Sequence, residues 1–96
     1  MNALILLFKN SSIADYEICN IRIDYAKKSI LIDCISCDMK NVLLSVDNFC
    51  FFSITHKEPW GEGKYVASSD IIIDNTIAKI TIELNSGDII LIDCEV

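Results

Sequence analysis

The chain has 96 residues, a formal net charge of −6 and a pI of about 4.5, and 52% of its residues are hydrophobic. This length is enough for one domain and too short for two, and the composition is that of a globular protein. Nucleic acids and anionic lipids bind basic surfaces, so the acidity argues against both as partners. A basic protein is the charge-matched partner.

The negative charge is concentrated in the second half of the chain. Residues 1–48 hold six acids and five bases, a balance of −1, whereas residues 49–96 hold eight acids and three bases, a balance of −5. An uneven field of this kind steers a cationic partner toward one region. The alternative is that the acidity only keeps the protein soluble.

The cysteines and the first residues indicate a cytoplasmic protein with free thiols. The chain has five cysteines, which cannot all pair with one another. The apolar run Ala3–Phe8 lacks a basic leader and is too short for a secretory signal or a membrane span. Without a signal, the reducing cytosol is the expected location.

The first half of the chain predicts three strands in order. Ala3–Phe8 is continuously apolar, as expected of a strand that is buried on both faces. Tyr16–Asp24 and Ile30–Cys37 alternate apolar and polar residues, with a polar loop between them. Their predicted inner faces carry Cys19, Ile21 and Ile23 in the first of these two strands, and Ile30, Ile32 and Cys34 in the second.

Residues 39–48 are ambiguous, because Val42, Leu43, Val46 and Phe49 recur at helical spacing and a short helix is one interpretation. The remaining strands are clearer. They are predicted over Phe49–Ile54, Tyr65–Ile73, Ile77–Leu84 and Ile89–Glu95.

The last two strands predict a specific hairpin. If Asn85–Gly87 is a three-residue loop with Gly87 in the left-handed conformation, every cross-strand pair on one face is apolar. Those pairs are Ile82 with Ile90, Ile80 with Ile92, and Ala78 with Cys94, while Lys79 meets Asp93 and Thr81 meets Leu91 on the other face. A one-residue shift would place Thr81 and Glu83 opposite core isoleucines.

Together these elements predict a single all-β domain over residues 1–96. Strands joined by short loops favour an antiparallel sandwich or a partly open barrel of about seven strands, with the short helix near 39–48 as the one exception. A parallel sheet would need crossover helices, for which the chain has no room.

No motif indicates catalysis, a metal or a cofactor. Cys34 and Cys37 have C-x-x-C spacing, but a structural zinc site needs a second ligand pair, and a redox motif needs a helix start. His56 is the only histidine, and a pair with Cys50 or Cys94 would lack an orienting group and an oxyanion hole. We therefore expect a protein that is not an enzyme.

The segment Lys57–Tyr65 contains the only proline, the only tryptophan and two of the three glycines. Aromatic residues are favoured anchors at protein interfaces, and carboxylates pair with cationic side chains. The predicted partner-binding residues are Glu58, Trp60, Glu62 and Tyr65, with Glu83 as a further candidate. The alternative is that the loop is only a connection and that Trp60 folds back to cap the core.

In size, acidity and strand content, with a Pro59-Trp60-Gly61 loop followed by a hairpin over 83–88, the chain resembles small immunity proteins of bacterial polymorphic and contact-dependent toxin systems. The resemblance implies a cytoplasmic inhibitor that neutralises a cognate toxin, in this case a basic nuclease, by occluding its active site. The alternatives are an assembly module, such as a homodimer joined through sheet edges, and an enzyme that uses a thiol.

Overall fold

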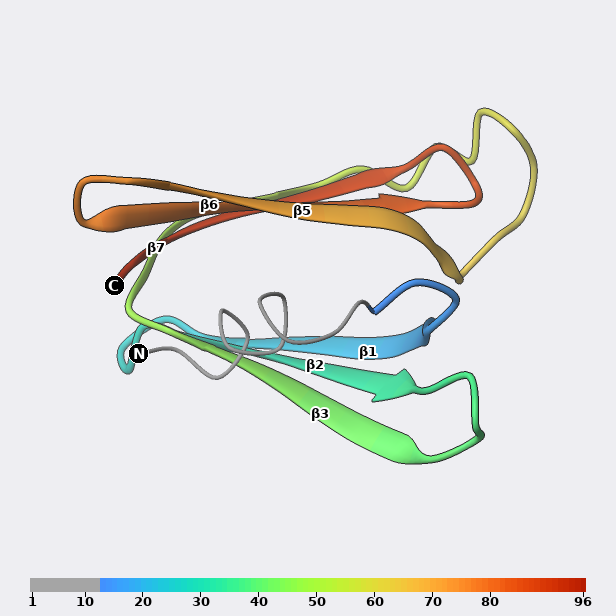
Figure 1. Cartoon of the computed structure of the whole chain (residues 1–96), viewed down its shortest axis with the longest axis horizontal. Coiled ribbons are helices and arrows are strands. Elements are labelled where there is room, and N and C mark those ends of the chain that lie inside the picture. Colours follow the sequence, from blue (N-terminus) through green and yellow to red (C-terminus); the bar gives the residue numbers. More distant parts are fainter. Residues whose placement is uncertain (1–12) are drawn as a thin grey trace.

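The computed structural model describes residues 13–96, which form seven strands in two antiparallel sheets (Figure 1). The strands are β1 (Glu17–Asp24), β2 (Ser29–Ile35), β3 (Asn41–Asp47), β4 (Phe49–Ile54), β5 (Val66–Asp74), β6 (Ile77–Leu84) and β7 (Ile89–Glu95). One sheet has the order β1-β2-β3, and the other has the order β4-β7-β6-β5. The predicted strand Ala3–Phe8 lies outside the described residues.

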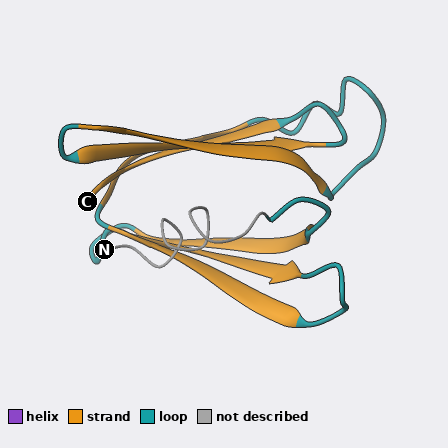
Figure 2. Ribbon diagram, viewed as in Figure 1, coloured by secondary structure: helices purple, strands orange, loops and turns teal. Residues whose placement is uncertain are grey.

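The two sheets lie face to face as a sandwich and do not close into a barrel (Figures 1 and 2). The core lies between them, because alternate residues of β2, β3, β6 and β7 point inward. Its fully buried members are mainly isoleucines, namely Ile13, Ile30, Ile32, Ile80, Ile82, Ile90 and Ile92. Within the described part of the chain, no helix is long and apolar enough to span a membrane.

The hairpin of β6 and β7 has the predicted register. Ile82 pairs with Ile90 and Ile80 with Ile92, all of them at most 1% exposed. Gly87 has φ +89°, the left-handed conformation that the three-residue loop requires. Side-chain period and turn chemistry therefore select the same pairing.

Residues 39–48 are not helical, so the short helix was a wrong interpretation. Asn41–Asp47 is strand β3, which pairs with β2 over its whole length. Val42 and Val46 are four residues apart, a spacing that fits a helix face and also one face of a strand. The buried Leu44 between them decides in favour of the strand, because it completes an inward face with period two.

The inner face of β1 also differs from the prediction. A β-bulge between Ile18 and Asn20 adds Cys19 to the strand without a partner on β2, and Cys19 is exposed. Ile21 is half-buried against the core, whereas Ile23 is 47% exposed near the end of this edge strand.

Candidate functional site

The loop between β4 and β5 is fastened to the β6–β7 turn by one buried carboxylate. Asp88, the residue before β7, is 1% exposed. Its Oδ1 accepts hydrogen bonds from Thr55 Oγ1 at 2.9 Å and from the Lys57 amide at 2.7 Å. Its Oδ2 accepts them from the Glu58 amide at 3.0 Å and from Ser86 Oγ at 2.8 Å. Four donors thus converge on one side chain.

These hydrogen bonds set the charge of Asp88. Burial alone would raise the pKa of the carboxyl group, because burial disfavours the charged form. The donors from Lys57, Ser86, Thr55 and Glu58 outweigh burial and lower the pKa to about 2. Asp88 is therefore ionised at neutral pH, and its charge is used inside the fold rather than at the surface.

The tip of the loop packs on the glycine of the turn. The Trp60 amide donates a hydrogen bond to the carbonyl of Ser86 at 3.0 Å. A Cβ atom added to Gly87 would lie 2.7 Å from Pro59 Cγ and 2.9 Å from Trp60 Cδ2. Gly87 is therefore required both for its positive φ and for this close approach.

The far end of the loop is held by Asn85. The amide of Tyr65 donates to Asn85 Oδ1 at 3.3 Å, and the amide of Asn85 donates to the carbonyl of Tyr65 at 2.9 Å. Gly63 lies so close to this turn that an added Cβ would be 2.8 Å from the Ser86 nitrogen and would overlap the Asn85 side chain. Both ends and the tip of the loop are thus fixed to the same turn.

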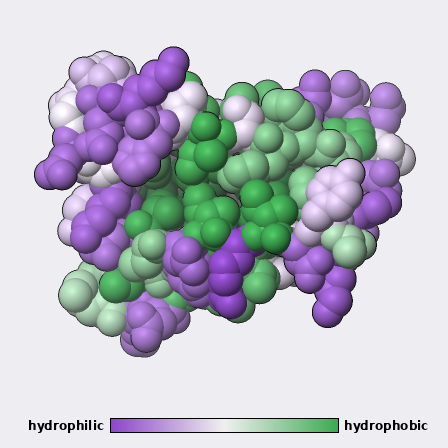
Figure 3. Space-filling view, turned by 180° about the vertical axis from the view of Figure 1, so that it is seen from behind, coloured by the Kyte–Doolittle hydropathy of each residue, from purple (hydrophilic) through white to green (hydrophobic). Residues whose placement is uncertain are grey.

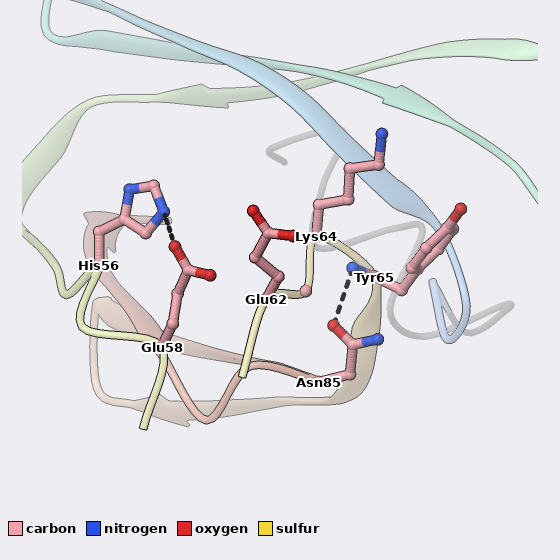
Figure 4. Close-up of a pocket in the computed structure, with 7 residues that line it drawn as sticks. His56, Glu58, Glu62, Lys64, Tyr65 and Asn85 are labelled. Carbon is pink, nitrogen blue, oxygen red and sulfur yellow. Dashed lines mark hydrogen bonds and ion pairs between the residues drawn. The ribbon is translucent and has the colours of Figure 1, made fainter. Parts of the chain in front are cut away.

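The fixed loop supplies all but one of the residues that line a pocket of about 410 Å³. The residues that line it are His56, Glu58, Glu62, Gly63, Lys64, Tyr65 and Asn85. In Figure 4 the side chain of Glu62 lies between those of Glu58 and Lys64. The lining holds the two carboxylates of Glu58 and Glu62, so it suits a cationic group better than an anionic one.

The side chains of His56 and Lys64 each contact an acid. His56 Nε2 lies 3.0 Å from Glu58 Oε1, and Lys64 Nζ lies 3.6 Å from Glu17 Oε2, outside the pocket lining. Glu58 has φ +48°, a left-handed conformation that is costly for a residue with a Cβ atom. Five other non-glycine residues of the described chain also have positive φ, so this conformation marks a tight turn and does not by itself indicate a functional site.

The structure brings three of the five predicted residues together. Glu58, Glu62 and Tyr65 line the pocket. Trp60 is 75% exposed at the tip of the same loop, so the alternative that Trp60 caps the core is wrong. Glu83 lies elsewhere, because it points outward on β6 between the inward-facing Ile82 and Leu84.

No cysteine lines the pocket that contains His56. Cys94 is buried in the core, and Cys50 Sγ lies 3.5 Å from the Asp93 carbonyl oxygen. Within residues 13–96, no group of three or more His, Cys, Asp or Glu side chains is placed to hold a metal ion. Cys37 is exposed in the turn after β2, whereas Cys34 is buried on the strand, so the C-x-x-C pair spans two environments.

Sequence reasoning missed the residue on which the site depends. An aspartate after a glycine turn is expected to be solvated, and nothing in the sequence indicated that Asp88 is buried. Asn85 and Ser86 were assigned only to the turn, although both bind the loop. The usable signal was the run of four turn-type residues, Asn85–Asp88, which offers more side-chain hydrogen-bonding groups than a three-residue hairpin loop needs.

Comparison of the chain with protein-family models, with curated proteins and with solved structures gave no match.

Proposed function

We propose that this protein is an immunity-type inhibitor that binds a basic bacterial toxin, a nuclease, and neutralises it by occluding its active site. The observation that carries the proposal is the exposed Trp60 on a loop that is locked to the β6–β7 turn. An exposed tryptophan on a fixed loop binds a partner with little loss of conformational entropy.

Charge supports the same assignment. Glu58 and Glu62 stand beside Trp60 on the loop, and the half of the chain that contains them has a balance of −5. A nuclease that binds a polyanion has a cationic cleft. Carboxylates steer such a cleft toward the loop, and the aromatic rings of Trp60 and Tyr65 supply short-range contact.

The test first isolates the partner by pulldown from the native cell with this protein as bait, and recovery of no basic nuclease would contradict the proposal. The association of the purified nuclease with the inhibitor is then measured by stopped flow. The double variant Glu58→Lys/Glu62→Lys should slow association at low ionic strength and weaken its dependence on salt. The matched control is Asp70→Lys/Asp74→Lys, which makes the same change in net charge on exposed residues of β5. Equal effects of the two double variants would show that only total charge matters and would remove the loop from the proposal.

Two further measurements complete the test. Trp60→Ala should speed dissociation without changing the salt dependence of association, because the ring acts after encounter. Glu83→Lys should slow association no more than the single change Asp70→Lys on β5, since Glu83 lies outside the pocket lining. If the inhibitor leaves nuclease activity unchanged at saturating concentration, the proposal fails regardless of binding.

A further inference from the structure

The last residues of the loop between β4 and β5 are also fixed to the first strand. The Ile18 amide donates a hydrogen bond to the Lys64 carbonyl at 2.7 Å, and Glu17 forms an antiparallel bridge with Tyr65. The end of the loop is therefore held beside the beginning of β1, which belongs to the other sheet.

Glu17 also binds the side chain of Lys64. Lys64 Nζ lies 3.6 Å from Glu17 Oε2, and Cys19 Sγ donates to the same oxygen at 3.4 Å. The Glu17 side chain is only 21% exposed, so its carboxylate is nearly fixed. In Figure 4 the ammonium group of Lys64 points away from the carboxylates of Glu58 and Glu62. The ion pair thus holds a cation of the pocket lining away from the acids of the pocket.

Glu62 is the carboxylate that this arrangement leaves without a cation. It is two residues before Lys64 in sequence, yet within residues 13–96 its carboxylate has no hydrogen bond or ion pair. Glu58 contacts His56 Nε2 at 3.0 Å, and an imidazole is cationic only when it is protonated. Two carboxylates that line one pocket repel each other, so a cation between them would lower the energy of both.

Lys64 is the cation of this chain that would compete for that place. A group tethered by a short segment acts at an effective concentration in the millimolar range, which an outside cation has to overcome. The ion pair with Glu17 removes this competitor.

The pocket lies at a hydrophilic end of the molecule. Seen from behind, the end that carries the loop is covered mainly by hydrophilic residues, whereas the middle of the same face is hydrophobic (Figure 3). Tyr65, which is 43% exposed, supplies an aromatic ring to the pocket lining. A guest is therefore recognised by charge and by contact with a ring, and not by burial among aliphatic side chains.

We propose that the pocket binds one arginine side chain of the partner, and that Glu17 is the positioning residue that keeps the pocket free for it by holding Lys64 outside. A guanidinium group presents five N–H donors in a planar fork, so it pairs with carboxylates on two sides and stacks on the ring of Tyr65. The ammonium group of a lysine lacks the flat face that stacks. The inference rests on the proposed function for the identity of the partner, but not for the chemistry of the pocket.

The test is an NMR titration of the full chain with methylguanidinium chloride at constant ionic strength. Amides of residues 58–65 should shift in a saturable way with a Kd on the order of 10 mM, because exposed ion pairs are individually weak. Methylammonium chloride should bind more weakly, since it offers no planar fork. The absence of a saturable shift up to about 200 mM, or equal binding of the two cations, overturns the inference.

Glu17→Gln should raise the Kd for methylguanidinium about threefold or more, because it releases Lys64 toward Glu62. The matched control is Asp33→Asn, which makes the same change in net charge and releases Arg22, 3.3 Å away, while neither residue lines the pocket. It should leave the Kd unchanged. Equal effects of the two variants would show that only total charge matters and would overturn the role of Glu17.

The double variant Glu17→Gln/Lys64→Met should restore the wild-type Kd, because it has no competing cation and keeps the wild-type net charge. A residue that only stabilised the fold would not be rescued in this way, so failure of the rescue also overturns the role of Glu17.

The titration uses no nuclease, so this inference and the proposed function fail separately. A nuclease that is inhibited by a chain whose pocket binds no methylguanidinium overturns this inference alone. A pocket that binds methylguanidinium in a chain that inhibits no nuclease overturns the proposed function alone.

Discussion

The carboxylate of Asp88 accepts the amide hydrogen of Glu58 at 3.0 Å, and Glu58 is the loop residue with φ +48°. The buried acid therefore holds the backbone of an acid that lines the pocket. Asp88 is at most 1% exposed and does not line the pocket, so it positions Glu58 and does not meet a ligand itself. The backbone of the loop is thus held by a charge that lies outside the pocket lining.

Asp88→Asn should loosen the loop and lower the thermal unfolding midpoint by several degrees. Each carboxylate oxygen accepts a backbone amide, from Lys57 or from Glu58, so either orientation of the asparagine places its NH₂ group against an N–H donor. Calorimetry and hydrogen exchange at residues 57 and 58 measure the two effects. Asp93→Asn, on the outward face of β7, is the control and should change stability little. Unaltered exchange in Asp88→Asn would contradict the role assigned to Asp88.

Stability should fall in acid through the same residue. The pKa of Asp88 is lowered from 3.8 to about 2 in the folded protein, so the unfolded chain binds the proton more readily. A lowered folded-state pKa contributes stability that is complete above the unfolded pKa and is lost as pH falls through the folded pKa. Urea denaturation from about pH 5 to about pH 2 measures the free energy of unfolding of both proteins. The difference between wild type and Asp88→Asn should become smaller as the pH falls. A gap that is constant over this range would mean that Asp88 is not ionised in the native protein.

The sequence predicts those parts of the fold that depend on local pattern. β4, β6 and β7 have the predicted bounds, because period two and a short glycine turn leave one register for Ile80, Ile82, Ile90 and Ile92. The sequence of β3 is ambiguous, because the spacing of Val42 and Val46 fits the period of a helix and also that of a strand. Only the pairing with β2 shows that the segment is a strand. The bulge at Cys19 depends on how β1 pairs with β2, and no pattern in the local sequence indicates it.

The site was predictable only in its outward-facing residues. Composition alone marked the loop that carries Glu58, Trp60 and Glu62. The contacts that fix the loop join residues 20 to 33 positions apart in sequence, such as Glu58 and Asp88. A charged residue is read as solvated unless its partners are known, and those partners are backbone amides that every residue has.

Gly87→Ala should displace Trp60 from the turn. The added methyl group would meet Pro59 and Trp60 and would also occupy a left-handed backbone, which together cost about 1–3 kcal/mol. Because Trp60 is the only tryptophan, its fluorescence reports the loop directly. Gly61→Ala is the control, since Gly61 has φ +105° but no atom within 4 Å of an added Cβ. Both variants should lose stability, and only Gly87→Ala should change acrylamide quenching. An identical change in both would assign the effect to backbone strain alone.

Replacements at Glu58 separate the strain of the loop from its charge. Glu58→Ala and Glu58→Gly both remove the carboxylate, and both keep the backbone amide that Asp88 binds. Only glycine relieves the left-handed backbone, so Glu58→Gly should be more stable than Glu58→Ala by about 1 kcal/mol in urea denaturation.

The association rate constant with the basic nuclease should nevertheless fall by the same factor in the two variants, because each removes one carboxylate from the pocket. If Glu58→Gly associates much more slowly than Glu58→Ala, the rigidity of the loop contributes to encounter as well as its charge. If neither variant associates more slowly than wild type, the Glu58 carboxylate serves only its contact with His56 Nε2, at 3.0 Å, and the partner must be recognised by Trp60 without it.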